Sequence, residues 1–311
     1  MAKPKSRPSR TASLGAGSAA FFRRLTVRAL LGAAFTSTVG YGFYALRERV
    51  AKQHAFPQSQ LGIILKQRPT WMSDALAQQV ANSIRPAGLH SAMDHQVLRD
   101  VADVCAANPW VKNVRQVRRV FNKAPGDAIE VDCDYRTPMA LVHCGDQLVL
   151  IDEEGHKLPE RYPAAHPPRI MLDAKGHMNI RIIDGVHALP PYLDGQKWTG
   201  DDLRAGIHLA KLLHGKTYTE EIHRINVSNF AGRRNPRDPQ ITLVTKHRTE
   251  IRWGEPLDVT FQVEKSPAEK LQRLASLHQR YGRIDGGYSW LDIRLDKVLY
   301  PQGESPLVQG N

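Results

Sequence analysis

The chain has 311 residues, of which 41% are hydrophobic and 24% charged, a composition that excludes collagen-like and disulfide-scaffold proteins. Its net charge is +12, but residues 1–52 hold ten Lys and Arg against one acid, which leaves +3 for the other 259 residues. A nucleic-acid-binding body carries its basic residues on the folded domain itself. The charge distribution therefore argues against nucleic acid as a partner, and the length allows two ordinary domains.

An apolar stretch near the N-terminus predicts a single transmembrane helix at 25–46. Its sequence is LTVRALLGAAFTSTVGYGFYAL, and Ala29 to Leu46 gives 18 residues without a charge, about the length that crosses a bilayer. Hydroxyl residues and glycines dilute its apolar character. A cleaved signal peptide and a soluble helix are the alternatives.

Basic residues before this stretch predict its orientation. Since positive charge favours the cytoplasmic side, Arg23, Arg24 and Arg28 place the N-terminus in the cytoplasm and the chain after about residue 47 outside it. The sequence predicts a protein of the cell inner membrane, with the bulk of the chain in the periplasm. Residues 1–24 are expected to form a disordered basic cytoplasmic tail, and residues 47–60 a linker.

Residues 61–137 predict a small domain with the order strand, helix, helix, strand, strand. The first strand is LGIILKQ at 61–67. Helices are expected at about 73–85, with Ser73 as N-cap, and at about 92–107. The last two strands, NPWVKNVRQVRRVF at 108–121 and AIEVDCDYR at 128–136, form a hairpin, and the second alternates apolar and polar residues.

The first strand of this hairpin presents a basic surface without an acid. Its basic residues are Lys112, Arg115, Arg118 and Arg119. We expect them to face solvent opposite Glu130, Asp132 and Asp134, where cross-strand pairs form. Nucleic acid is not expected here, because only two aromatic residues are near.

Residues 138–300 predict a β-rich domain with two helices, followed by a loose tail at 301–311. One helix is expected at about 200–214. The other opens with SPAE, in which Ser266 is the N-cap and Glu269 closes a capping box, and it ends at Gly282. Strands are expected at QLVLIDEEGHKL, EIHRINVSNF, QITLVTKHRTEIRWG and SWLDIRL. The predicted fold class is therefore α+β.

The sequence carries no pattern that indicates a catalytic site or a cofactor. It holds no P-loop, zinc-protease, nucleophile-elbow or S-x-x-K motif, and no histidines with metal-ligand spacing. An anchored envelope enzyme acting on wall polymer remains an alternative, through acids on two hairpins. It requires Asp132, Asp134, Asp152 and Glu153 to meet in one cleft, with one carboxylate of raised pKa.

Three cysteines do not make a disulfide framework. Cys105 on a helix and Cys133 on the apolar face of a strand are expected to be buried small side chains. Cys133 and Cys144 lie on neighbouring predicted strands, and a disulfide between them in an oxidising compartment stays open.

Several stretches resemble the bacterial cell-division family FtsQ/DivIB. NPWVKNVRQVRRVF followed by DAIEVDCDYRTPMALV is similar to the end of the first exported module of that family, which is called a POTRA domain. DQLVLIDEEGHKLP is similar to the hairpin that opens the β domain of the family. EKLQRLASLHQRYG and SWLDIRL resemble its late helix and strand, with Asp292, Ile293 and Arg294 at the D-L-R positions. Leu295 departs from the tyrosine that is common in the family.

The resemblance implies a non-enzymatic single-pass scaffold that recruits and regulates septal wall synthesis. It implies partners of the FtsB/DivIC-like and FtsL-like kinds, together with septal wall synthases, and no cofactor. An exposed edge strand can accept a partner segment, and WLDIRLDKVLY at 290–300 is the candidate edge. The expected partner-binding residues are Trp290, Arg294, Asp296, Val298 and Tyr300. Another POTRA-bearing envelope assembly protein is the remaining alternative.

Overall fold

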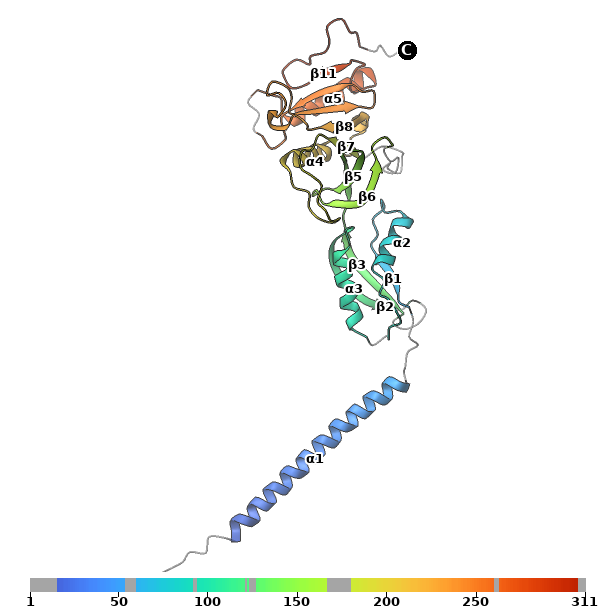
Figure 1. The fold of residues 1–311 in the computed structure, drawn as a ribbon, viewed down its shortest axis with the longest axis vertical. Helices are drawn as coiled ribbons and strands as arrows, with labels where there is room; N and C mark the ends of the chain where they lie inside the picture. The colour runs from blue at the N-terminus through green and yellow to red at the C-terminus, as the bar shows by residue number, and fades with distance from the viewer. Residues whose placement is uncertain are drawn as a thin grey trace, which may run out of the picture. The chain divides into compact units, whose positions relative to one another are not determined.

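The computed structural model describes residues 16–53, 60–91, 94–120, 122, 127–166, 180–259 and 263–306 (Figure 1). The chain divides into two compact units, and each is described by itself. One unit comprises Met1–Ser59 and Leu89–Met93, and the other comprises Gln60–Gly88 and Asp94–Asn311. The first 15 residues of the expected tail, residues 54–59 of the expected linker and residues 307–311 lie outside the described residues.

Helix α1 runs over Ala16–Gln53, so it begins inside the expected tail and ends inside the expected linker. The prediction of a transmembrane helix is wrong, because no helix in the described part of the chain combines the length and the apolar character that a bilayer crossing requires. Within 25–46, threonines, a serine and three glycines interrupt the apolar residues, and the hydroxyls of Thr36 and Thr38 donate to carbonyls one turn back.

The orientation drawn from Arg23, Arg24 and Arg28 depended on that span. These three arginines belong to α1, and their expected role at a membrane stays a prediction.

The second unit begins with a three-stranded sheet and two helices. In chain order these are β1 (Gly62–Lys66), α2 (Asp74–Ser83), α3 (Gln96–Ala107), β2 (Val111–Val120) and β3 (Ala128–Tyr135). The strand order is β1-β3-β2, with β1 parallel and β2 antiparallel to the central β3. A parallel pair requires a crossover connection, which α2, α3 and β2 provide here. The elements follow in the predicted order.

Apolar residues on one face of this small sheet pack against both helices. Ser73 caps α2 as predicted, since its side chain accepts the Leu76 N–H at 3.2 Å. Alternation along β3 turns Ile129 and Val131 toward the helices, where both are fully buried. The core is completed from the helices by Val80, Ile84, Val97, Val101 and Cys105.

The rest of the chain forms an eight-stranded sheet in the order β11-β10-β9-β8-β7-β4-β5-β6. The strands are β4 (Pro138–Cys144), β5 (Gln147–Asp152), β6 (Lys157–Pro163), β7 (Arg181–Asp184), β8 (Ile222–Asn226), β9 (Ile241–Thr245), β10 (Glu250–Gly254) and β11 (Trp290–Asp292). Two short 3-10 helices, η1 (Thr217–Glu221) and η2 (Phe230–Gly232), flank β8. At one end, β11 pairs in parallel with β10, so it is the edge strand.

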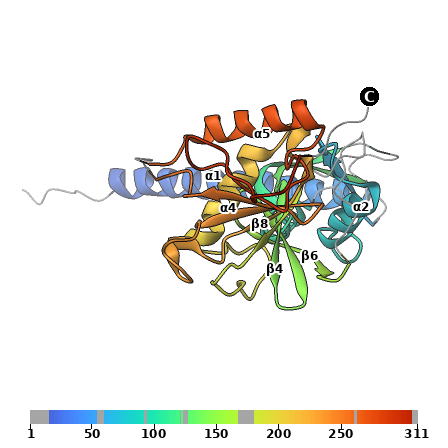
Figure 2. The ribbon, with the colours of Figure 1, turned by 90° about the horizontal axis from the view of Figure 1, so that it is seen from above.

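Two helices pack on this sheet, α4 (Asp201–Leu213) and α5 (Pro267–Tyr281) (Figures 1 and 2). The predicted capping box of α5 is present, because the Ser266 side chain accepts the Glu269 N–H while the Glu269 carboxylate accepts the Ser266 N–H. Gly282 ends the helix in the left-handed conformation. Apolar residues of both helices share one core with the central strands. The architecture is α+β.

Candidate functional site

The basic strand β2 pairs with the acids of β3 in part as the sequence predicts. Arg115 donates to Asp134 through Nε at 3.1 Å and through a second, shorter contact. Arg118 Nη2 lies 2.7 Å from Glu130 Oε1. The hydrogen bonds from Arg115 lower the pKa of Asp134. Solvent and salt screen half-exposed pairs of this kind, so they form a charged surface and contribute little to the stability of the fold.

The other two basic residues behave differently from the prediction. Lys112 reaches past its hairpin to the β5–β6 turn, with Nζ 2.6 Å from Glu154 Oε1. Arg119 donates to the backbone oxygen of Asp94 at 2.9 Å, and burial lowers its pKa. The expected surface of four solvated cations is therefore a surface of two hairpin pairs, with one lysine and one arginine engaged elsewhere.

The acids of the enzyme alternative lie in ion pairs on two hairpins. Asp132 pairs with Lys66 at 2.9 Å, and the buried Asp152 accepts from Arg136 at 2.9 Å. Asp134 takes Arg115, and Glu153 lies 3.6 Å from Lys112. This arrangement does not supply the paired carboxylates in one cleft that the alternative requires.

One cluster has the residue types of a metal site. Ligand atoms of Asp152, Glu154 and His156 lie within 4.8 Å of one another. However, Asp152 already accepts the N–H groups of Glu154 and His156 at 2.8 and 2.7 Å, in addition to Arg136. These hydrogen bonds close the β5–β6 turn, so the cluster has a structural explanation.

Strand β11 and the residues after it form the predicted partner-binding segment. Trp290 is half-buried beneath the guanidinium of Arg252, whose Cζ lies 4.6 Å from the ring centroid. Val298 packs against the main core. Asp296 is exposed but pairs with Lys265 at 2.8 Å. Tyr300 is half-exposed, and its ring stacks on Tyr288 at 4.6 Å between centroids.

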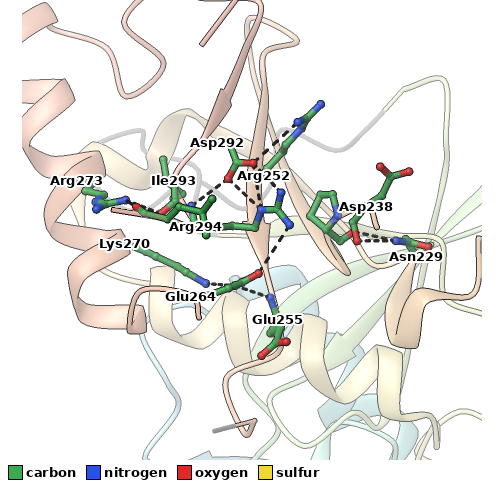
Figure 3. A network of polar contacts seen from close by, with 12 residues as sticks. Asn229, Asp238, Arg252, Glu255, Glu264, Lys270, Arg273, Asp292, Ile293 and Arg294 are labelled. Atoms are coloured by element: carbon green, nitrogen blue, oxygen red, sulfur yellow. Dashed lines mark hydrogen bonds and ion pairs between the residues drawn. The ribbon is translucent and has the colours of Figure 1, made fainter. Parts of the chain in front are cut away.

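Arg294, the fifth predicted contact residue, is engaged inside the protein (Figure 3). It donates to both carboxylate oxygens of Asp292, at 2.7 Å through Nη2 and at 3.0 Å through Nε. Burial alone raises the pKa of Asp292, but the hydrogen bonds from Arg294 outweigh it and leave the pKa below its usual value. The spacing of two residues makes this a local pair that shapes the edge, and the expected contact of Arg294 with a partner stays a prediction.

A buried network behind this pair connects α5 to the edge (Figure 3). Lys270 of α5 is fully buried, and its Nζ lies 2.7 Å from Glu264 Oε2. The same carboxylate accepts the Glu255 N–H at 3.1 Å. From the next turn of α5, Arg273 donates to the carbonyls of Ile293 at 3.0 Å, of Leu295, and of Asp296 at 2.7 Å. The helix therefore holds the turn that follows β11.

Sequence reasoning missed Lys270, Glu264 and Arg273. The apolar period of α5 marks Leu271 and Leu274 as inward but gives no signal for a buried lysine beside them. An acid shortly before the helix is a weak local signal, and the carbonyls that Arg273 binds are 20 or more residues away.

A groove of about 540 Å³ lies between α5 and the segment after β11. Its helix wall carries Gln272, Ser276, Leu277 and Arg280, and Val298 and Tyr300 stand on the opposite side. The lining mixes charged, amide, aliphatic and aromatic groups. Such a lining suits a polypeptide better than a small apolar ligand.

The fold and this edge define an α+β protein with a candidate protein-binding site at one end of its sheet. A stretch of 116 residues, 36% of the chain, is 29% identical to the protein named cell division protein FtsQ of Novosphingobium aromaticivorans. The match spans 34% of that relative, about a third of its length. No protein-family model matches the chain. The similarity is distant, and it indicates a general connection with cell division.

Proposed function

We propose that this chain is a non-enzymatic scaffold of the cell-division machinery and that it binds other division proteins at the β11 edge. The observation that carries the proposal is the position of β11 at the end of an eight-stranded sheet, beside a groove lined by both polar and apolar side chains. The similarity to an FtsQ protein supports the division role.

The mode of binding that fits this site is addition of an extended segment to the sheet edge, with its side chains in the groove against α5. Main-chain hydrogen bonds supply affinity in this mode, and pockets for alternate side chains supply specificity. The partners we propose are small single-pass division proteins of the FtsB/DivIC-like and FtsL-like kinds, and through them septal wall synthases. The expected location at the cell inner membrane stays a prediction.

The proposal is tested by photo-crosslinking in dividing cells. A photo-reactive amino acid replaces Lys297, an exposed residue of the candidate segment, in the full-length chain. The matched control carries it at Tyr192, which is 92% exposed in the loop between β7 and α4. Crosslinked proteins are identified by mass spectrometry.

We expect division proteins to be crosslinked from position 297 and not from position 192. Equal recovery from both positions would place the contact elsewhere on the surface. Recovery of no division protein from position 297, with the protein folded and present at normal level, would remove the proposed function.

A further inference from the structure

Residues 298–304, called the strap here, already occupy part of the free edge of β11. Leu299 exchanges two backbone hydrogen bonds with Asp292, at 2.8 and 3.0 Å. Beyond it, Glu304 accepts the Ser289 N–H at 2.8 Å and the Ser289 hydroxyl at 2.6 Å, which lowers the pKa of Glu304. The strap therefore runs antiparallel to β11, like an added strand.

The ladder between β10 and β11 shows which backbone groups are left for an additional strand. Glu250 N–H donates to the Ser289 carbonyl at 3.3 Å, and Ile293 N–H donates to the Arg252 carbonyl at 3.4 Å. In a parallel pair, alternate residues face the neighbouring strand. The backbone N–H and C=O groups of residues 289, 291 and 293 thus point toward β10, while those of Trp290 and Asp292 point toward the free edge.

The strap pairs with only one of these two edge residues. With Asp292 opposite Leu299, antiparallel register puts Pro301 opposite Trp290. Proline has no N–H, and in the described residues no backbone hydrogen bond joins Pro301 and Trp290. The pairing of the strap with β11 is thus interrupted at the position where a second pair of backbone hydrogen bonds would form.

The side chains of the strap are also less buried than those of β11. Leu299 is 46% and Tyr300 50% exposed, whereas Leu291 and Ile293 are fully buried. Val298, its first residue, packs against the main core, and beyond it two backbone bonds, one ring stack and the Glu304 carboxylate hold the strap. Because few buried apolar contacts resist its departure, local opening at low free energy is expected.

We propose that the strap is a displaceable cover, and that a partner strand pairs with β11 only after the strap has left the edge. The occupant is an extended polypeptide segment with the chemistry of the strap itself, an aliphatic and aromatic pair followed by a carboxylate that reaches Ser289. The inference rests on the proposed function for the identity of the partner. The departure of the strap from β11 depends on this chain alone and not on which partner binds.

The test uses a fluorescent synthetic peptide with the sequence of residues 296–305 as the strand probe and measures its binding to full-length protein by anisotropy. Glu304→Gln weakens the strap by removing one charged contact. Pro301→Ala strengthens it by giving the position opposite Trp290 an N–H. Glu153→Gln removes an acid in the β5–β6 turn and is the control.

We expect Glu304→Gln to bind the probe about tenfold more tightly than the unchanged protein, the effect of losing one charge-assisted hydrogen bond. Pro301→Ala should bind it more weakly, and the control should not differ. Thermal unfolding shows that each variant is folded.

Equal binding to all four proteins, the same direction of change in the two strap variants, or absence of binding to Glu304→Gln would each overturn the proposal. This outcome is independent of the crosslinking experiment. Failure of crosslinking with success of the probe would remove the division role and leave the displaceable cover in place.

Discussion

The buried ion pair of Lys270 and Glu264 gives a prediction whose size follows from its surroundings. Lys270 is fully buried, with Nζ 2.7 Å from Glu264 Oε2 and 5.2 Å from the centroid of the Trp253 ring. Burial lowers the pKa of Lys270, and the carboxylate of Glu264 opposes that shift. Glu264→Gln would remove the carboxylate that accepts a hydrogen bond from the buried ammonium group.

The cost follows from what each variant leaves behind. Removing one partner of a buried ion pair costs about 3–5 kcal/mol. The amide of Glu264→Gln still accepts the Glu255 N–H, which is 3.1 Å away in the native protein, so we expect the lower end, about 3 kcal/mol. Lys270→Met keeps the packed stem, and the Glu264 carboxylate that it leaves behind still has Arg294 Nη1 3.9 Å away. We therefore expect a smaller loss, about 1 kcal/mol, and about the same for the double variant.

The assay is equilibrium unfolding in urea, followed by circular dichroism, for the unchanged protein, both single variants and the double variant. The control is Arg204→Met, which breaks an exposed pair with Asp201 and should cost no more than about 0.5 kcal/mol. The reasoning is refuted if Glu264→Gln costs less than about 1 kcal/mol, or if the double variant loses the sum of the two single losses.

Three further predictions concern a glycine, the thiols and pH. Gly254→Ala places a Cβ 2.0 Å from a neighbouring carboxylate oxygen at φ 100° and should cost about 3 kcal/mol or more. Gly303→Ala has φ 90° with no atom within 4 Å and should cost about 1 kcal/mol; equal losses in unfolding free energy would contradict the steric argument. A bulky thiol reagent should modify Cys144 alone in the native protein and all three cysteines after unfolding, because the other two are buried; rapid modification of three native thiols would contradict this. The depressed pKa of Asp292 stabilises the fold above the unfolded pKa of about 3.9, and this contribution is lost as pH falls through the folded pKa. The difference in unfolding free energy between the unchanged protein and Asp292→Asn should therefore be constant above about pH 5 and shrink below about pH 4; a difference independent of pH would disprove it.

Features that depend on neighbours in sequence were predictable. The capping box at Ser266 and Glu269 was found because both hydrogen bonds close within four residues. The strand at Ala128–Tyr135 was found because alternation reports directly which side chains face the helices. Three of the predicted contact residues, Asp296, Val298 and Tyr300, line the groove, and their contact with a partner stays a prediction.

Features that depend on distant partners were not predictable. Arg273 gave no signal in the sequence, because the carbonyls that it binds are 20 or more residues further along the chain. Cys133 was left open as a disulfide partner of Cys144, whereas the structure places it in the small core with Cys105. The transmembrane span at 25–46 was inferred from its lack of charged residues, but the helix that contains it is not apolar enough over the length that a bilayer crossing requires.

The parallel pairing of β10 with β11 also determines when the candidate edge comes into existence. Helix α5 lies between the two strands in the chain, and the strap follows β11 up to Glu304. The other seven strands of the large sheet have therefore left the ribosome before the edge is made. A partner that recognises β11 would thus distinguish a chain translated past Glu304 from a nascent or prematurely terminated chain.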